Sequence, residues 1–162
     1  MMQKEKELLL KDLCTRLPYG VIGQCEIDAS YDTSFDTILQ THKFDAVVYG
    51  LKADSLFVYP LIENKDEQEF ANEEVADGVD ILDFKPYLFH LSSMTEEQRK
   101  YIADRWGINE EFDFEINPDW GEYFVELGDI VDFIDWLNEN RFDYKGLIEK
   151  GLAIDATGLN IY

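Results

Sequence analysis

The chain has 162 residues, of which 46% are hydrophobic and 14% aromatic, so it can bury the core of one domain. That aromatic content excludes a disordered acidic tail, a class in which aromatic residues are scarce. With 14 basic residues against 35 acidic ones, the net charge is −21, which opposes binding to nucleic acid or to an anionic membrane. We therefore expect a single domain over residues 1–162.

The amino-terminal part predicts one helix followed by one strand. Apolar residues repeat at the spacing of one helix face and predict a helix over 4–16 that ends before Pro18. Alternating residues over 21–27 predict a strand, and the polar residues of 28–36 predict a loop. The apolar run near the amino terminus holds only three leucines, which is too short for a signal peptide, so we expect a cytoplasmic protein.

The next part predicts strands and a hairpin. Apolar and β-branched runs predict strands over 37–42, 46–51 and 55–62. The short connection 52–54 joins the last two strands as a hairpin. Pro60 indicates that the last strand lies at an edge of the sheet or ends at this residue.

Residues 63–83 form the most acidic stretch of the chain. They hold nine acidic residues and a single base, Lys65. Because like charges repel and are costly to bury, we expect an exposed and mobile excursion of the domain, with a short helix over 68–75.

The following part predicts a buried strand over 87–91 and then a helix. Thr95 and Gln98 have the spacing of a capping box, and Gly107 is suited to end the helix that follows. Alternation over 112–116 predicts a half-buried strand, with 123–127 as its antiparallel partner.

The carboxyl-terminal part predicts a helix over 129–140 with Asp129 as its N-cap, and Asp143 as the cap of a short turn. Residues 152–162 are expected to form an extended segment packed against that helix or the sheet, with a turn at Gly158. The side chains expected to be buried there are Leu152, Ile154, Ala156, Leu159 and Ile161.

Strands dominate the first half of the chain and helices the second, with short connections between them. This order predicts an α+β fold with a small antiparallel sheet or an SH3-like barrel in the N-terminal half and helices concentrated toward the C-terminus. The chain shows neither an internal repeat nor a linker that divides it.

Three stretches carry a resemblance to a known family. They read KDLCTRLPYG at 11–20, KPYLFHLSSMTEEQ at 85–98 and DWLNENRFDYKGLIEKGLAIDATGLNIY at 135–162. Together they resemble an uncharacterised family of proteins from Bacteroides-type gut bacteria and their phages and mobile elements. The resemblance implies a bacterial or phage cytoplasm and an accessory role in phage–host biology, and it implies neither an activity nor a catalytic residue.

Motifs for cofactor or metal chemistry do not appear in the sequence. Neither phosphate-binding glycine pattern occurs, and Cys14 and Cys25 do not have metal-ligand spacing. We expect both cysteines to be buried, unbridged thiols and His90 to be a packed histidine. No catalytic residue, cofactor or metal is therefore predicted.

The candidate interaction residues lie in the final third of the chain. Asp129, Asp132 and Asp135 recur along the predicted helix opposite its apolar stripe, where solvated carboxylates are the ordinary outcome. Trp120 and Tyr123 lie near a predicted turn, which suits exposed aromatic anchors. We expect a non-enzymatic acidic module that binds another protein, and the net charge permits a basic partner. The alternatives are a DNA mimic that inhibits a host nucleic-acid-binding protein, and a carboxylate-dependent hydrolase.

The charge balance makes one prediction about nucleic acid. Phosphate affinity comes from lysine and arginine, and 14 such residues face 35 acidic ones, so no binding to DNA or RNA is expected at physiological salt. A gel-shift titration at that salt checks this. A sub-micromolar complex would contradict it.

Overall fold

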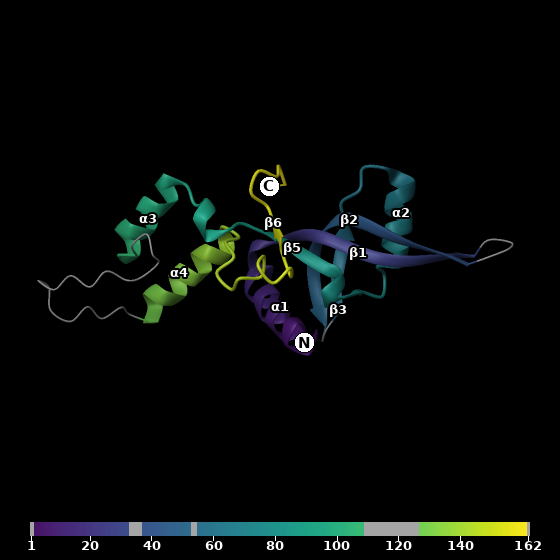
Figure 1. Cartoon of the computed structure of the whole chain (residues 1–162), viewed down its shortest axis with the longest axis horizontal. Helices are drawn as coiled ribbons and strands as arrows, with labels where there is room; N and C mark the ends of the chain where they lie inside the picture. Colours follow the sequence, from purple (N-terminus) through teal and green to yellow (C-terminus); the bar gives the residue numbers. More distant parts are fainter. Residues whose placement is uncertain (1, 33–36, 53–54, 109–126, 162) are drawn as a thin grey trace, which may run out of the picture.

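A curled, mostly antiparallel sheet forms the amino-terminal half of the protein, and helices pack beside it (Figure 1). The structure is a computed structural model that describes residues 2–32, 37–52, 55–108 and 127–161. The α+β prediction is confirmed. In these residues the helices are α1 (Met2–Arg16), α2 (Lys65–Glu74), α3 (Glu96–Trp106) and α4 (Leu127–Glu139), with short 3-10 helices η1 (Leu17–Tyr19), η2 (Ile81–Asp83) and η3 (Leu91–Ser93).

The strands of the described residues are β1 (Val21–Asp32), β2 (Thr37–Lys52), β3 (Ser55–Pro60), β4 (Val79–Asp80), β5 (Phe84–Leu88) and β6 (Ile154–Asp155). They form one six-stranded sheet in the order β4-β3-β2-β1-β5-β6, in which only the β5–β6 pair is parallel. The chain from β4 through η2 to β5 crosses from the β3 edge to the β1 edge. This crossing curls the sheet into a half-barrel.

The two long strands β1 and β2 correct the predicted loop over 28–36. Asp28 to Asp32 pair with Thr41 to Thr37 in an antiparallel hairpin, and β2 is one strand where two were predicted. Polar composition indicated a loop, but antiparallel backbone pairing requires no apolar face. The predicted β2–β3 hairpin is confirmed, and β3 ends at Pro60.

The first apolar core fills the concave side of the half-barrel. Leu9 and Leu13, one helical turn apart on α1, are buried against strand residues such as Val21, Cys25 and Ala46. Gly23 allows β5 to approach β1, because a Cβ at this position would lie 2.4 Å from the carbonyl oxygen of Lys85.

The acidic stretch 63–83 is built into this core and is not a separate excursion. Ala71, Val75 and Val79 lie four residues apart and are buried, as is Ile81 in η2. The apolar series anchors α2 and β4 while the carboxylates of α2 lie at the surface. The predicted short helix is confirmed, and the mobility of the stretch stays a prediction.

A second apolar core joins α3 and α4. Its buried residues are Met94, Ile102, Ile108, Leu137 and Phe142, packed with aromatic side chains including Trp106, Phe133 and Trp136. The capping box at Thr95 and Gln98 is present, with the Gln98 N–H donating to Thr95 Oγ1 at 3.2 Å. Gly107 ends α3 with φ of 63°, as predicted.

Helix α4 begins two residues earlier than predicted, so Asp129 lies in its first turn and is not the N-cap. The helix ends in a Schellman motif: the Phe142 N–H donates to Leu137 O at 2.9 Å and the Arg141 N–H to Asn138 O at 3.1 Å. Arg141 holds the left-handed position, with φ of 61°. The strands predicted over 112–116 and 123–127 fall on residues 109–126, outside the described ones.

The carboxyl-terminal segment is docked on the sheet, as predicted, but only part of its predicted buried set is buried. Residues Ile154 and Asp155 pair with β5, and the Ala156 N–H donates to Leu88 O at 2.8 Å. Ala156 is buried, as predicted, and Ala153 is buried as well, whereas Leu159 is 49% exposed. Leu152, Ile154 and Ile161 are half-buried. The alternating apolar pattern wrongly predicted that Leu159 is buried, because only two residues of the segment pair as a strand. Gly158 turns the chain with φ of 80°.

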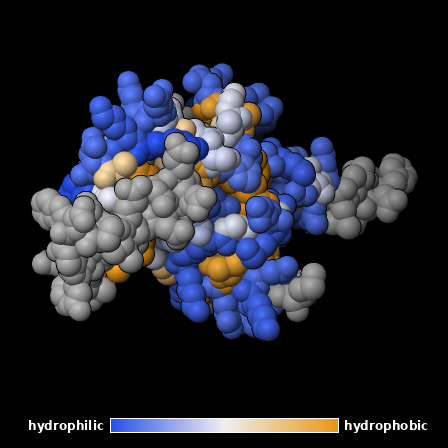
Figure 2. All heavy atoms as spheres, turned by 60° about the vertical axis from the view of Figure 1, so that its left-hand side comes forward, coloured by the Kyte–Doolittle hydropathy of each residue, from blue (hydrophilic) through white to orange (hydrophobic). Residues whose placement is uncertain are grey.

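Hydrophilic side chains cover most of the face seen in Figure 2, and apolar ones appear there as separate patches. This distribution matches a net charge of −21, because carboxylates are costly to bury. Among the described residues, none of the helices combines the length and the apolar character that crossing a membrane requires.

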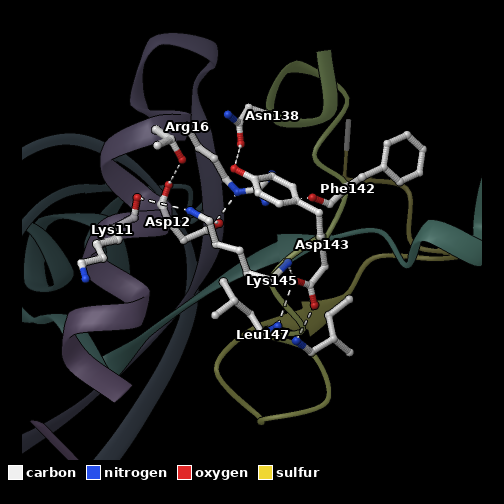
Figure 3. A network of polar contacts seen from close by, with 11 residues as sticks. Lys11, Asp12, Arg16, Asn138, Phe142, Asp143, Lys145 and Leu147 are labelled. Carbon is white, nitrogen blue, oxygen red and sulfur yellow. Dashed lines mark hydrogen bonds and ion pairs between the residues drawn. The ribbon is translucent and has the colours of Figure 1, made fainter. Parts of the chain in front are cut away.

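A buried polar network joins α1 to the turn after α4 (Figure 3). Arg16, 2% exposed, donates from Nε to Asp12 Oδ2 at 2.7 Å and from Nη2 to the Phe142 carbonyl at 2.8 Å. The Lys145 ammonium lies 3.4 Å from the second Asp12 oxygen. Asp143 accepts from the N–H groups of Leu147 and Ile148 at 2.9 and 2.7 Å, which confirms its predicted capping role.

This network predicts an asymmetric response to substitution. Arg16→Met leaves the Asp12 carboxylate buried with only the Lys145 ammonium nearby, and should lower the free energy of unfolding by about 3–5 kcal/mol. Asp12→Leu combined with Arg16→Met removes the buried charge pair and should recover most of that loss. Urea denaturation of the three proteins measures the differences.

The matched control is Lys43→Met, which removes a lysine from the exposed ion pair with Glu26 at 2.8 Å. It should cost less than about 1 kcal/mol. A double variant as unstable as Arg16→Met alone would show that the unpaired carboxylate is not the cause of the loss.

Candidate functional site

A cluster of charged side chains lines a groove on the sheet half of the protein. The groove has a volume of about 440 Å³ and is bounded by β1, the end of α2, β4, η2 and the start of β5. Its charged side chains are Glu26, Asp28, Glu74, Asp80, Asp83 and Lys85. Five carboxylates thus face a single lysine in the lining.

Local structure places these carboxylates. Glu26 and Asp28 alternate with the core residue Cys25 and with Ile27 along β1, so they project from the other side of the strand. Gly78, with φ of 90°, turns the chain from α2 into β4. Asp80 then caps η2, because its Oδ1 accepts from the Leu82 N–H at 2.9 Å.

Lysines neutralise part of this charge. The Lys6 ammonium, from α1, donates to Asp80 Oδ2, and Lys43 pairs with Glu26 at 2.8 Å. With Lys85 in the lining, three lysines meet five carboxylates. The groove therefore keeps a net negative charge.

The two aspartates of η2 have pKa values displaced in opposite directions. The hydrogen bond from Lys6, and then that from the Leu82 N–H, holds the pKa of Asp80 below its usual value. Desolvation raises the pKa of Asp83, and the nearby charges of Asp80 and Asp28 raise it further. Burial and the neighbouring carboxylates thus both favour the protonated form of Asp83.

A pair of carboxylates with separated pKa values is the arrangement that acid–base hydrolysis uses. In Asp80, however, each oxygen already has a structural partner, one in the backbone of η2 and one in α1. Because both oxygens of the Asp80 carboxylate bind groups within the protein, Asp80 is poorly placed to transfer a proton. The groove is therefore better suited to binding cations than to proton transfer.

The five residues predicted from the sequence lie elsewhere. Asp129 and Asp132 on α4 lie 3.9 and 3.7 Å from the Arg105 guanidinium, so they link α4 to α3. Desolvation, and then the charge of Asp135, raises the pKa of the Tyr19 hydroxyl, so this third carboxylate of α4 acts on η1. Helix α4 lies at the opposite end of the molecule from α2 and β4 (Figure 1). Trp120 and Tyr123 fall outside the described residues.

Sequence reasoning missed the groove because its residues come from distant parts of the chain. The acidity of 63–83 was evident, but Glu26 and Asp28 lie about fifty residues earlier and reach the groove only through the fold. The available signal was the strand alternation over 21–27, extended by one residue to Asp28.

The cysteines and histidines do not form a reactive pair. Both thiols are free, as predicted, but Cys14 is exposed and only Cys25 is buried. Burial, with the Asp83 charge, raises the pKa of Cys25 to about 12, which disfavours the nucleophilic thiolate. Within the described ranges, no group of three metal-ligating side chains comes together.

The two histidines have structural surroundings. The His42 ring lies 5.2 Å from that of Phe70 on α2. His90 is half-buried, with Nε2 at 3.8 Å from an Asp155 oxygen.

Comparison of the chain with protein families, with curated proteins and with solved structures finds no match in any of the three.

The raised pKa of Asp83 predicts how stability depends on pH. When folding raises the pKa of a carboxyl group, the protonated form of that group stabilises the fold. This contribution to stability is complete below the unfolded-state pKa and is lost as pH rises through the folded-state pKa. Asp83→Asn imitates the protonated form, so it should raise the melting temperature at pH 7. The gain should disappear below about pH 3.8, where the wild-type carboxyl is also neutral.

Thermal melting across that pH range checks this. Asp80→Asn should have the opposite sign at pH 7, because its lowered pKa means that the charged form stabilises the fold. Equal effects of the two substitutions at pH 7 would contradict the assignment.

Proposed function

We propose that this protein is a non-enzymatic interaction module whose acidic groove binds a basic segment of another protein. The observation that carries the proposal is the groove itself, a hollow of about 440 Å³ in which five carboxylates meet one lining lysine. A lysine or arginine of a partner would meet a field that the protein's own residues only partly neutralise.

The electrostatics of Asp83 support this choice of partner. Repulsion from Asp80 and Asp28 contributes to its raised pKa, so an incoming cation would relieve an existing cost. The net charge of −21 would also steer a basic partner toward the protein and speed the encounter at low salt. The bacterial or phage cytoplasm that the resemblance implies is where we place this interaction.

A short oligolysine peptide is a suitable probe for the groove. Titration into isotopically labelled protein should shift the backbone resonances of Glu26, Asp28 and Gly78 first. Asp28→Asn combined with Asp83→Asn should weaken binding about tenfold at low salt, since an exposed ion pair is worth up to about 1 kcal/mol and a tenfold change in affinity corresponds to about 1.4 kcal/mol. Affinity should fall steeply as salt shortens the Debye length.

Two control variants remove the same charge elsewhere. Asp104→Asn with Glu149→Gln changes exposed acids outside the groove and should reduce affinity much less. Asp129→Asn with Asp132→Asn tests the α4 surface. Equal losses in all three double variants would mean that the peptide responds to net charge alone, and a loss confined to the α4 variant would move the site there.

Capture from bacterial lysate identifies the natural partner. A DNA mimic is the sharper form of the proposal, because carboxylates can occupy a groove that normally takes phosphates. In that case the captured protein should bind nucleic acid, and added DNA should displace it from the immobilised wild-type protein. A partner that DNA does not displace would leave the basic-segment proposal and exclude mimicry.

A further inference from the structure

Strand β1 has one edge that the sheet covers only in part. Strand β2 pairs with β1 along its whole length, from Val21 to Asp32. On the other edge β1 pairs with β5, and this ladder covers only Gly23 to Cys25. Among the described strands, none pairs with that edge over residues 26–32. Figure 1 shows β1 and β2 continuing past the other strands as a two-stranded arm.

The register decides which backbone groups of β1 bond to β2. The Leu61 N–H donates to Asp45 O at 2.7 Å, so the backbone groups of Asp45 point toward β3. Because successive residues of a strand point these groups to opposite sides, those of Phe44 point toward β1. Phe44 lies opposite Cys25, and the register continues without a shift to the end of β1. The backbone groups of Cys25 therefore bond to β2.

The same alternation directs other backbone groups of β1 to the open edge. Ile27, two residues after Cys25, also bonds to β2. The N–H and C=O groups of Glu26 and Asp28 point the other way. Outside the strand ladders, the described residues make no backbone hydrogen bond to either of them. An edge of this kind is a template on which a further strand can pair.

The acidic groove lies along this edge. Its lining includes the three consecutive residues 26–28, although successive side chains of a strand project to opposite faces. A hollow that meets all three contacts the edge between the two faces. Val79 and Asp80 of β4 and Asp83 of η2 also line it. The groove therefore lies where an added strand would run, with carboxylates from several elements around it.

Charge decides which chain would pair there. Two copies of this protein, each with a net charge of −21, would bring the acidic residues of both edges together. Like charges on neighbouring strands are destabilising, so a second copy is a poor occupant. An extended segment with lysine or arginine would instead place cations beside Glu26 and Asp28 on one face of the sheet and near Asp83 in the groove.

We propose that the basic segment of the partner binds as an added β-strand along residues 26–32 of β1, an inference that rests on the function proposed above. The segment would form backbone hydrogen bonds with Glu26 and Asp28, and the carboxylates would select its basic side chains. The edge is roughly 23 Å long at about 3.3 Å per residue, which matches a segment of about seven residues.

Two peptides of equal charge test this mode of binding. One alternates lysine and threonine, and the other has the same sequence with every backbone nitrogen methylated, so it donates no backbone hydrogen bond. The methylated peptide should bind the full-length protein at least about tenfold more weakly at low salt, because several hydrogen bonds are lost. The unmodified peptide should slow amide exchange at Glu26 and Asp28, measured by NMR, and not at Ile27, which already bonds to β2.

Two substitutions at one position separate the backbone bond from the charge. Asp28→Pro and Asp28→Asn both remove the carboxylate, but only proline also removes the N–H, at an edge position where strands tolerate it. Asp28→Pro should bind the unmodified peptide roughly three- to tenfold more weakly than Asp28→Asn, the worth of one hydrogen bond. Circular dichroism checks that both variants fold, and the comparison of the two peptides needs neither variant.

The outcomes distinguish this inference from the proposed function. Equal affinity of the two peptides, with exchange at Glu26 and Asp28 unchanged, would overturn strand addition and leave the acidic groove as a binding site for basic segments. Absence of binding by either peptide would contradict both proposals. A folded Asp28→Pro that binds as well as Asp28→Asn would also overturn strand addition. So would a dimer in sedimentation without peptide in which the Glu26 and Asp28 amides are protected, because a second copy would then occupy the edge.

Discussion

The buried guanidinium of Arg16 is the contact that joins α1 to the turn after α4, and the relative placement of the two apolar cores depends on it. It holds Asp12 within α1 and the Phe142 carbonyl after α4, so one side chain links the first helix to a residue 126 positions later. The planar fork of arginine suits this task, because its separate nitrogens can serve a carboxylate and a carbonyl at once. A buried pair of this kind contributes position more than net stability.

The large negative charge is compatible with the fold because the acidic residues lie around apolar anchors. In 63–83, the side chains of Ala71, Val75 and Val79 enter the core while the carboxylates of α2 remain in water. The fold then brings that acidic surface next to Glu26 and Asp28 from β1. The resulting groove concentrates charge that the sequence spreads over sixty residues.

The opposite end of the molecule uses its acids differently. Asp129 and Asp132 pair with Arg105, so these carboxylates of α4 join it to α3. The same residue type thus lines the groove at one end of the protein and makes structural contacts on α4 at the other. Spacing along a helix shows that such residues share a face, but only the neighbouring elements decide what they meet.

Local chemistry was predictable from the sequence. The capping box at Thr95, the stop at Gly107 and the cap at Asp143 were predicted and are present, because each depends on residues within a few positions of one another. The α+β class also followed, since the order of strands and helices determines which layers can form.

Contacts between distant residues were decided only by the tertiary structure. The exposure of Cys14, the burial of Ala153 beside an exposed Leu159, and the pairing of Arg16 with Phe142 each depend on an element far along the chain. The same is true of the groove. Periodicity reports which residues share a face of a helix or strand, whereas burial and charge at a site depend on what packs against that face.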